Sequence, residues 1–217
     1  MRLTQNNLLH ILTLLAGLLL ACTAYAGAQV YQPLSASVRS VLHQAVSDQA
    51  SSESAFTSQQ EADVWLNTMS ARLEKNIPNT TNRMDFLKTV HYEATRAGLD
   101  PQLVLGLIEI ESRFRKYAVS KVGARGYMQV MPFWAKEIGS SQHNLFHLRT
   151  NLRYGCTILR HYLDMENGSL YRALGRYNGS LGKPDYPNLV KAAWQGRWHL
   201  PQHTASTSEQ QQTGQKF

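Results

Sequence analysis

The stretch Gly98-Leu-Asp-Pro-Gln-Leu-Val-Leu-Gly-Leu-Ile-Glu-Ile-Glu-Ser-Arg-Phe114 decides the fold class and holds the most informative residue of the chain. Asp100 before Pro101 predicts a helix start, because an oxygen-bearing side chain caps the first turn and proline suits the first helical position. The apolar residues that follow recur at helical spacing on one face: Val104, Leu107 and Ile108.

Glu111 continues this apolar face, whereas Glu109 points to roughly the opposite side of the helix. A carboxyl group on an apolar face loses hydration, so we expect its pKa to rise and the group to stay protonated near neutral pH. That is the requirement for a general acid. The alternative is structural, a buried glutamate that pairs with an arginine.

The net positive charge of the chain indicates which kinds of binding partner suit it. Lys and Arg outnumber Asp and Glu by 22 to 15 in 217 residues, for a net charge of +7. This balance suits nucleic acid, a membrane surface or an acidic cell-wall polymer. The positive charge is spread along the chain without a dense basic run, which argues against a nucleic-acid reader. The sequence shows no zinc-type Cys/His spacing and no glycine-rich phosphate loop, so we expect no metal and no cofactor.

Residues 1–26 are typical of an export signal. After Arg2, the apolar stretch Leu8–Leu20 is too short to span a bilayer comfortably. Cleavage after Ala24-Tyr-Ala26 would release a soluble periplasmic protein. Leu19-Leu-Ala-Cys22 instead resembles a lipoprotein box, which would anchor the protein to the outer membrane, facing the periplasm, through lipidated Cys22. An uncleaved anchor helix is a third option.

The remaining chain is predicted to be all-α, with at most one small β-hairpin near residues 122–130. Helical periodicity predicts helices at residues 34–46, 61–74, 84–98, 100–112, 132–139, 150–166, 170–177 and around 189–194. A break is expected at 76–82, and disorder after His199. Cys156 lies on an apolar helical stripe and is expected to be a buried thiol, which excludes a disulfide framework.

Three separate segments are predicted to form the walls of one cleft. They mix aromatic or thioether faces with fixed amide groups, as sugar binding requires. Their candidate binding residues are Ser112, Tyr127, Met128, Gln129, Tyr177 and Asn178. The methionine and Tyr177 also fit a core role.

These segments carry a family resemblance. Glu111-Ser-x-Phe114, Gly123-Ala-x-Gly-Tyr-Met-Gln-Val-Met-Pro132, Asn151-Leu-x-Tyr-Gly155 and Tyr177-Asn178 occur in this order at compatible spacing. Residues 84–198 thereby resemble the catalytic domain of soluble lytic transglycosylases, related in fold to goose-type lysozymes. The resemblance implies a lysozyme-like helical domain with a cleft for peptidoglycan glycan strands.

The same resemblance implies roles for the motif residues. Glu111 aligns with the family's single catalytic acid, Met128 and Gln129 with its substrate-contacting segment, and Tyr177-Asn178 with its Tyr-Asn element. The chain departs from the pattern in having Tyr127 where leucine is usual and Gly179-Ser180 where Ala-Gly is usual, which would alter the cleft wall.

The implied activity is that of a murein lytic transglycosylase, which cleaves the β-1,4 bond between N-acetylmuramic acid and N-acetylglucosamine and forms 1,6-anhydro-muramyl ends. Hydrolysis would need a second carboxylate. None has a motif context among Glu109, Glu137, Asp164, Glu166 and Asp185. A hydrolytic muramidase of the same fold and a non-catalytic wall-binding module stay open as alternatives.

The expected organisation follows from these segments. It comprises a signal peptide at 1–26, a helical extension at 27–83, a catalytic domain at 84–198 and a disordered tail at 199–217. We expect a monomer.

Overall fold

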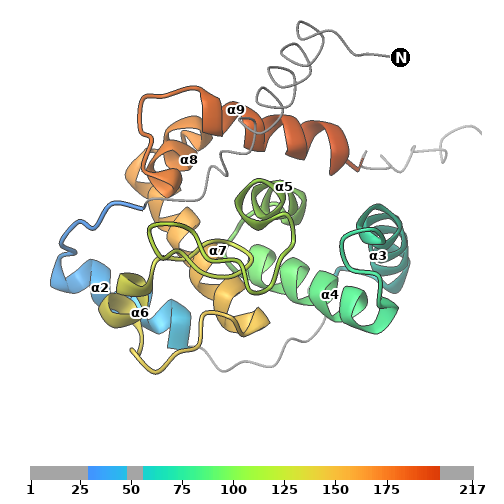
Figure 1. Ribbon diagram of the computed structural model, residues 1–217, viewed down its shortest axis with the longest axis horizontal. Helices are drawn as coiled ribbons and strands as arrows, with labels where there is room; N and C mark the ends of the chain where they lie inside the picture. The colour runs from blue at the N-terminus through green and yellow to red at the C-terminus, as the bar shows by residue number, and fades with distance from the viewer. Residues whose placement is uncertain (1–28, 48–55, 201–217) are drawn as a thin grey trace, which may run out of the picture.

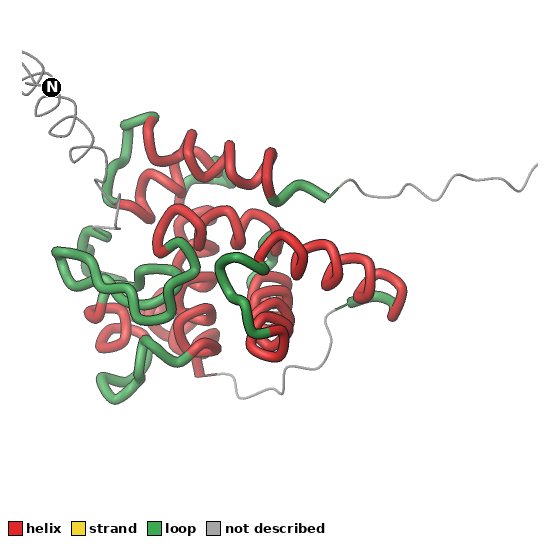
Figure 2. Tube along the Cα trace, turned by 45° about the vertical axis from the view of Figure 1, so that its right-hand side comes forward, coloured by secondary structure: helices red, strands yellow, loops and turns green. Residues whose placement is uncertain are grey.

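The computed structural model describes residues 29–47 and 56–200. The expected signal peptide, including Cys22, and the tail from residue 201 onward lie outside the described residues. Within these residues the fold is all-α, as predicted: helices are joined by loops, and no β-strand is present among them (Figure 2). The helices are α2 (Ala36–Ser47), α3 (Gln59–Leu73), α4 (Thr80–Arg96), α5 (Pro101–Ser112), α6 (Pro132–Ile138), α7 (Leu148–Met165), α8 (Leu170–Asn178) and α9 (Asp185–Ala192), followed by a π-helical turn, η1 (Ala193–Arg197).

Helix α7 is the centre of the fold, and helices α2, α4 and α8 pack around it (Figure 1). Its predicted apolar stripe is buried along the whole length of the helix. Helix α5 packs against α4 on one side and against α9 and η1 on the other. Because a helix covered from several sides has few polar positions to spare, the glutamates of α5 each have a defined environment.

The N-terminal helices pack onto the rest of the chain. Helix α2 lies against α6 and α7, and α3 lies against α4. The break expected at 76–82 is too long by three residues, because the Asn79 side chain accepts a hydrogen bond from Asn82 N and starts α4 at Thr80. Helix α4 therefore runs across the expected boundary at residues 83–84.

The expected hairpin near 122–130 is not built from strands. This region belongs to the long loop between α5 and α6, which holds two isolated antiparallel bridges, Val119 with Arg125 and Arg125 with Val130. Gly126 and Gln129 adopt φ of 76° and 49°, and these left-handed residues turn the chain before extended backbone can continue. The loop is closed instead by a hydrogen-bonded pair between the Arg125 and Val130 backbones, 3.0 Å in both directions.

The C-terminal helices cover α5 at very close range. A Cβ atom added at Gly106 would lie 2.9 Å from Trp194 N, so glycine lets the backbones of α5 and η1 meet. Asp100, which caps α5 through a 2.7 Å bond from Gln102 N, also accepts a 2.8 Å bond from Trp194 Nε1. The predicted helix start is confirmed, and it doubles as the anchor of η1.

One further prediction concerns Cys156. Cys156 is a fully buried free thiol, and burial raises its pKa well above the usual range, as expected for a packing residue. Among the described residues, no helix is long and apolar enough to cross a membrane.

Candidate active site

Glu111 lies at the end of α5 and is almost completely buried, with 4% of its surface exposed. The other glutamate of the helix, Glu109, faces away, as predicted. It pairs with Arg197 and accepts a 2.7 Å hydrogen bond from Trp198 Nε1. The two carboxyl groups of one helix thus have different surroundings, one an ion pair at the edge of the fold and the other the interior.

Left-handed backbone flanks Glu111. Arg113 and Phe114, directly after the end of α5, have φ of 52° and 61°, and Gln129 has a φ of 49°. These are three of the four non-glycine residues with positive φ in the described part of the chain. Such conformations cost of order 1 kcal/mol or more each and concentrate at functional sites. The strain falls on the two segments that the sequence singled out.

Asn151 holds the long loop in place from α7. Its side chain is fully buried, and its Oδ1 accepts a 2.8 Å hydrogen bond from Met128 N. Its Nδ2 donates to Arg125 O at 2.9 Å and to Leu145 O at 2.8 Å. One amide therefore satisfies three backbone groups of irregular chain, which accounts for asparagine at the start of the third motif.

Gly155, at the end of that motif, makes room for Met128. A Cβ atom on Gly155 would lie 2.3 Å from Met128 Sδ. The Met128 side chain is fully buried against α7, and its carbonyl oxygen accepts a 2.8 Å hydrogen bond from the Tyr177 hydroxyl. Tyr177 is itself fully buried. In this conformation both side chains support the loop from beneath, which is the core role that the sequence left open for them.

The remaining candidate binding residues lie on or beside the loop. Gln129 Nε2 donates to Ala118 O at 3.1 Å and Gly126 O at 2.9 Å, so the amide braces the loop from within. Ser112 is buried and donates to Ile108 O at 3.2 Å, whereas Tyr127 packs against Phe86 with ring centroids 4.9 Å apart. Asn178 ends α8. Contact of these side chains with a ligand stays a prediction.

Tyr186 is a site residue that the sequence reasoning missed. Its hydroxyl donates a 2.5 Å hydrogen bond to Glu111 Oε1, across 75 residues of chain. Burial, and next the negative charge of Glu111, raise the pKa of Tyr186 well above its usual range. The pKa of Tyr177 is raised well above its usual range in the same way. Both phenols therefore remain neutral hydrogen-bond donors beside the carboxyl group.

Gln29 is the second residue that was missed. It is buried, and its side-chain amide lies against the backbone on both sides of Val130. Gln29 Nε2 donates to Gln129 O at 3.4 Å, and Gln29 Oε1 accepts from Met131 N at 3.2 Å. The N-terminal segment thus reaches the strained Gln129, 100 residues away in sequence.

Most of the other carboxylates that were weighed as a second catalytic group form ion pairs with arginines away from Glu111. Glu137 pairs with Arg39 at 3.2 Å, Asp164 with Arg160 at 2.5 Å, and Glu166 with Arg172 and Arg176. Asp185 is exposed at the start of α9. Within the described ranges, no group of three or more metal-binding side chains comes together.

Comparison with known proteins finds one family model that is similar to the part of the chain that holds this site. Residues 88–188 match the family model described as Transglycosylase SLT domain. The matched range includes Glu111, the loop between α5 and α6, α7, α8 and Tyr186, whereas Gln29 lies outside it.

Several curated proteins are similar to parts of the chain. The transglycosylase of Enterobacteria phage PRD1 is 32% identical over 109 residues, which cover 50% of this chain and 40% of the phage protein. The membrane-bound lytic murein transglycosylase C of Glaesserella parasuis is 32% identical over 127 residues, 49% of this chain and 35% of that protein. Its namesake in Actinobacillus pleuropneumoniae serotype 5b is 49% identical over 47 residues, 22% of this chain and 13% of that protein. The chain therefore spans less than half the length of these relatives.

Proposed function

We propose that this protein is a peptidoglycan lytic transglycosylase and that Glu111 is its catalytic acid and base. The observation that carries the proposal is a buried carboxyl group held by a neutral tyrosine, within an SLT domain. The names of the similar proteins, a transglycosylase and two lytic murein transglycosylases, support the same activity.

The reaction needs one carboxyl group because the substrate supplies the nucleophile. Protonated Glu111 donates its proton to the glycosidic oxygen as the bond from C1 of N-acetylmuramic acid breaks. The substrate N-acetyl group stabilises the positive charge that develops at C1. Ionised Glu111 then takes the proton from the O6 hydroxyl, and O6 bonds to C1 to close the 1,6-anhydro ring. The proton passes from O6 to the leaving oxygen, and no water is consumed.

Tyr186 suits both halves of this cycle. While Glu111 is protonated, a hydrogen bond to its Oε1 from a phenol that stays neutral holds the carboxyl group in one orientation. After the proton has left, the same bond stabilises the carboxylate, since hydrogen bonds to charged acceptors are the stronger kind. We assign Tyr186 as a positioning residue that fixes the orientation of the carboxyl group.

The proposed binding surface for the glycan strand consists of the end of α8 and the long loop between α5 and α6, which Asn151 holds in place. Ser112, Tyr127, Gln129 and Asn178 would contact the sugars, with Met128 and Tyr177 as their support. The substitution of leucine by Tyr127 would add a hydroxyl group to this surface.

The proposed setting is the periplasm. The leader at residues 1–26 directs export, followed by release or by anchoring to the outer membrane through Cys22. Two of the similar proteins are described as membrane-bound. The proposed organisation is an N-terminal extension whose helices α2 and α3 pack on a catalytic domain that begins with α4, near the expected boundary at residues 83–84, and a monomer in solution.

The products distinguish this function from its alternatives. Purified protein is incubated with peptidoglycan sacculi, and the released muropeptides are analysed by mass spectrometry. Anhydro-muramyl ends are expected. Reducing ends would instead identify a hydrolytic muramidase, and binding to sacculi without release would identify a wall-binding module.

A further inference from the structure

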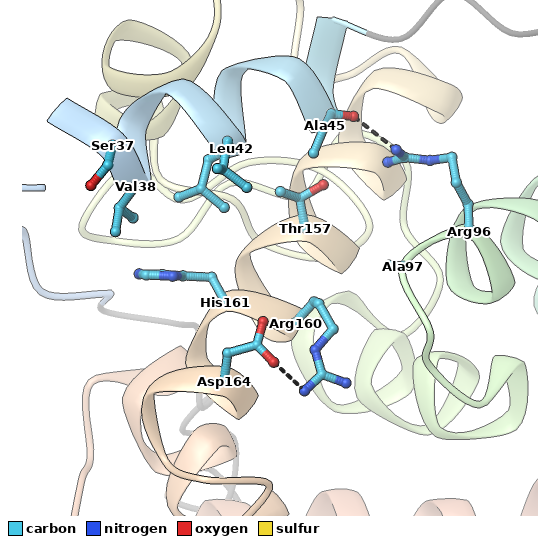
Figure 3. A pocket seen from close by; sticks show the side chains of 11 residues that line it. Ser37, Val38, Leu42, Ala45, Arg96, Ala97, Thr157, Arg160, His161 and Asp164 are labelled. Carbon is cyan, nitrogen blue, oxygen red and sulfur yellow. Dashed lines mark hydrogen bonds and ion pairs between the residues drawn. The ribbon is translucent and has the colours of Figure 1, made fainter. Parts of the chain in front are cut away.

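The arginines at the cavity between α2 and α7 are bonded to other groups of the protein. This cavity has a volume of about 450 Å³ and is lined mostly by apolar surface. Figure 3 shows Arg96 directed at the Ala45 carbonyl oxygen, to which it donates a 2.8 Å hydrogen bond. The same view shows Arg160 paired with Asp164 at 2.5 Å. Both cations are thus engaged within the protein.

The long loop between α5 and α6 differs, because it carries positive charge without a carboxylate. Residues 113–131 include five Lys or Arg residues and no Asp or Glu. Lys116, Lys121 and Arg125 are exposed, and none of them forms a salt bridge with a carboxylate in the described part of the chain. Like charges gathered on one loop repel one another, so this surface favours an anionic partner.

Two of these cations lie against aromatic rings. Lys116 Nζ is 5.3 Å from the centroid of the Tyr117 ring, and Arg125 Cζ is 5.9 Å from the centroid of the Phe146 ring. The two rings adjoin, with centroids 5.9 Å apart. Tyr117 is 71% exposed, whereas Phe146 is half-buried. These four residues form an accessible aromatic surface with a cation beside each ring, which we call the Tyr117 patch.

The Tyr117 patch adjoins the proposed glycan-binding surface. Ala118 directly follows Tyr117 in the chain. Its carbonyl oxygen accepts hydrogen bonds from Gln129 Nε2 at 3.1 Å and from Gly126 N at 2.9 Å. Burial, and next the charge of Tyr117, raise the pKa of Tyr127 above its usual range, so the two phenols lie near one another. A polymer that contacts Gln129 and Tyr127 can therefore continue onto Tyr117.

We propose that the Tyr117 patch extends the glycan-binding surface and selects strands whose stem peptides carry free carboxylates. The exposed Tyr117 ring packs against the apolar face of a sugar, and Lys116 and Arg125 bind carboxylates of the adjoining stem. Single-stranded nucleic acid would need a series of exposed rings for successive bases, and the patch offers one. Identifying the polymer as peptidoglycan rests on the proposed function, whereas its negative charge follows from the patch itself.

The test is a binding measurement with full-length Glu111→Gln, which is expected to hold glycan strands without cleaving them. Isothermal titration calorimetry compares soluble strands that retain their stem peptides with strands from which an amidase has removed the stems. Strands with stems should bind about tenfold more tightly, and high salt should narrow the difference. Equal affinity for the two ligands would overturn the proposal. So would binding of oligothymidylate or of anionic vesicles as tightly as strands with stems.

Substitutions in the Glu111→Gln background sharpen the test. Lys116→Gln together with Arg125→Gln should weaken binding of strands with stems about tenfold and leave binding of stripped strands unchanged. Removing the two cations and removing the stems break the same contacts, so the two losses should not add. Tyr117→Ala should weaken both ligands about fivefold, because a packing surface is lost. Lys75→Gln, at an exposed lysine after α3, is the matched control and should change nothing. Additive losses, or an equal loss in Lys75→Gln, would contradict the assignment.

The result for the Tyr117 patch is distinguishable from the result for the proposed function. Binding is measured without cleavage, whereas the function is tested by the muropeptides that the wild type releases. If no anhydro products appear but the strands bind as described, the proposed function fails and the patch stands. If anhydro products appear but the charges of Lys116 and Arg125 do not affect binding, only the patch is refuted.

Discussion

The Tyr186 hydroxyl and the Glu111 carboxyl group are joined by a 2.5 Å hydrogen bond inside the protein. This bond connects α9 to α5, two helices that pack directly on each other. Tyr186 and Val190, one turn apart, face the core together. The helix that covers the candidate acid therefore also supplies its hydrogen-bond donor, so packing and orientation of the carboxyl group depend on the same contact.

Tyr186→Phe is expected to lower kcat about 10- to 100-fold, the loss associated with a hydrogen bond to a charged group. KM should change little, because the phenol contacts Glu111 and is not proposed to touch the glycan. The measurement is the rate of muropeptide release as a function of substrate. Tyr171→Phe, which removes a partly exposed hydroxyl from α8, is the control and should keep full activity. Equal rates in the two variants would refute the positioning role.

Gln29→Ala is expected to lower kcat about tenfold, because Gln129 O and Met131 N lose their side-chain partners and the strained loop loosens. The comparison is with Gln32→Ala, an exposed glutamine of the same segment. Gln29→Glu keeps the acceptor for Met131 N but loses the donor, so its kcat should fall between those of the wild type and Gln29→Ala. A ranking in which Gln32→Ala is the more damaged variant would remove Gln29 from the site.

Gly155→Ala is expected to destabilise the protein by about 1–3 kcal/mol, because the new methyl group would overlap Met128 Sδ. Denaturant unfolding measures the change. In a Met128→Ala background, the same substitution should cost markedly less, since the overlapping atoms are gone. Simple additivity of the two substitutions would show that the residues do not compete for this space.

The buried side chain of His91 should make the stability of the fold sensitive to acid. Burial against Phe56 and Trp65 lowers its pKa to about 4, from 6.5 for an ordinary histidine, although Glu61 opposes the shift. Because the unfolded chain then takes up a proton at higher pH than the folded one, the free energy of unfolding should fall as pH decreases from about 6.5 to about 4. Above this range the His91 contribution is fully present.

The variant His91→Phe tests this contribution. Phenylalanine keeps the aromatic packing, and the histidine Nδ1 has no acceptor within the described residues whose loss would matter. Melting temperatures of wild type and variant are compared at pH 7 and pH 5. The wild type should lose more stability than His91→Phe over that interval, and parallel losses would assign the acid sensitivity to other groups.

Local sequence patterns were sufficient to predict most of the helices and the buried position of Glu111. The cap at Asp100 and the spacing to Ile108 are contained in a dozen residues, so α5 and the buried position of Glu111 follow from helical geometry. The start of α4 was misplaced because a side-chain cap at Asn79 outweighed a run of residues typical of a loop. The π-helical turn η1 has no such local pattern, since it depends on the contact of Trp194 with Gly106.

The residues that hydrogen-bond to the site could be identified only from the folded structure. Tyr186 meets Glu111 across 75 residues, and Gln29 meets Gln129 across 100. No periodicity in the sequence connects such positions. The asparagine and glycine of the third motif were visible as letters, but their reasons, three backbone hydrogen bonds and space for a methionine sulfur atom, are properties of the packed loop.

The central claim is that one buried carboxyl group carries the proton in both directions. Glu111→Gln preserves the size of the side chain and removes the proton that is transferred, so the variant should fold with wild-type stability. The decisive measurement is mass spectrometry of muropeptides released from sacculi by wild type and by Glu111→Gln at equal concentration. The account predicts anhydro-muramyl products from the wild type and a loss of at least about 100-fold in the variant. Anhydro products from Glu111→Gln at a rate near that of the wild type would contradict it.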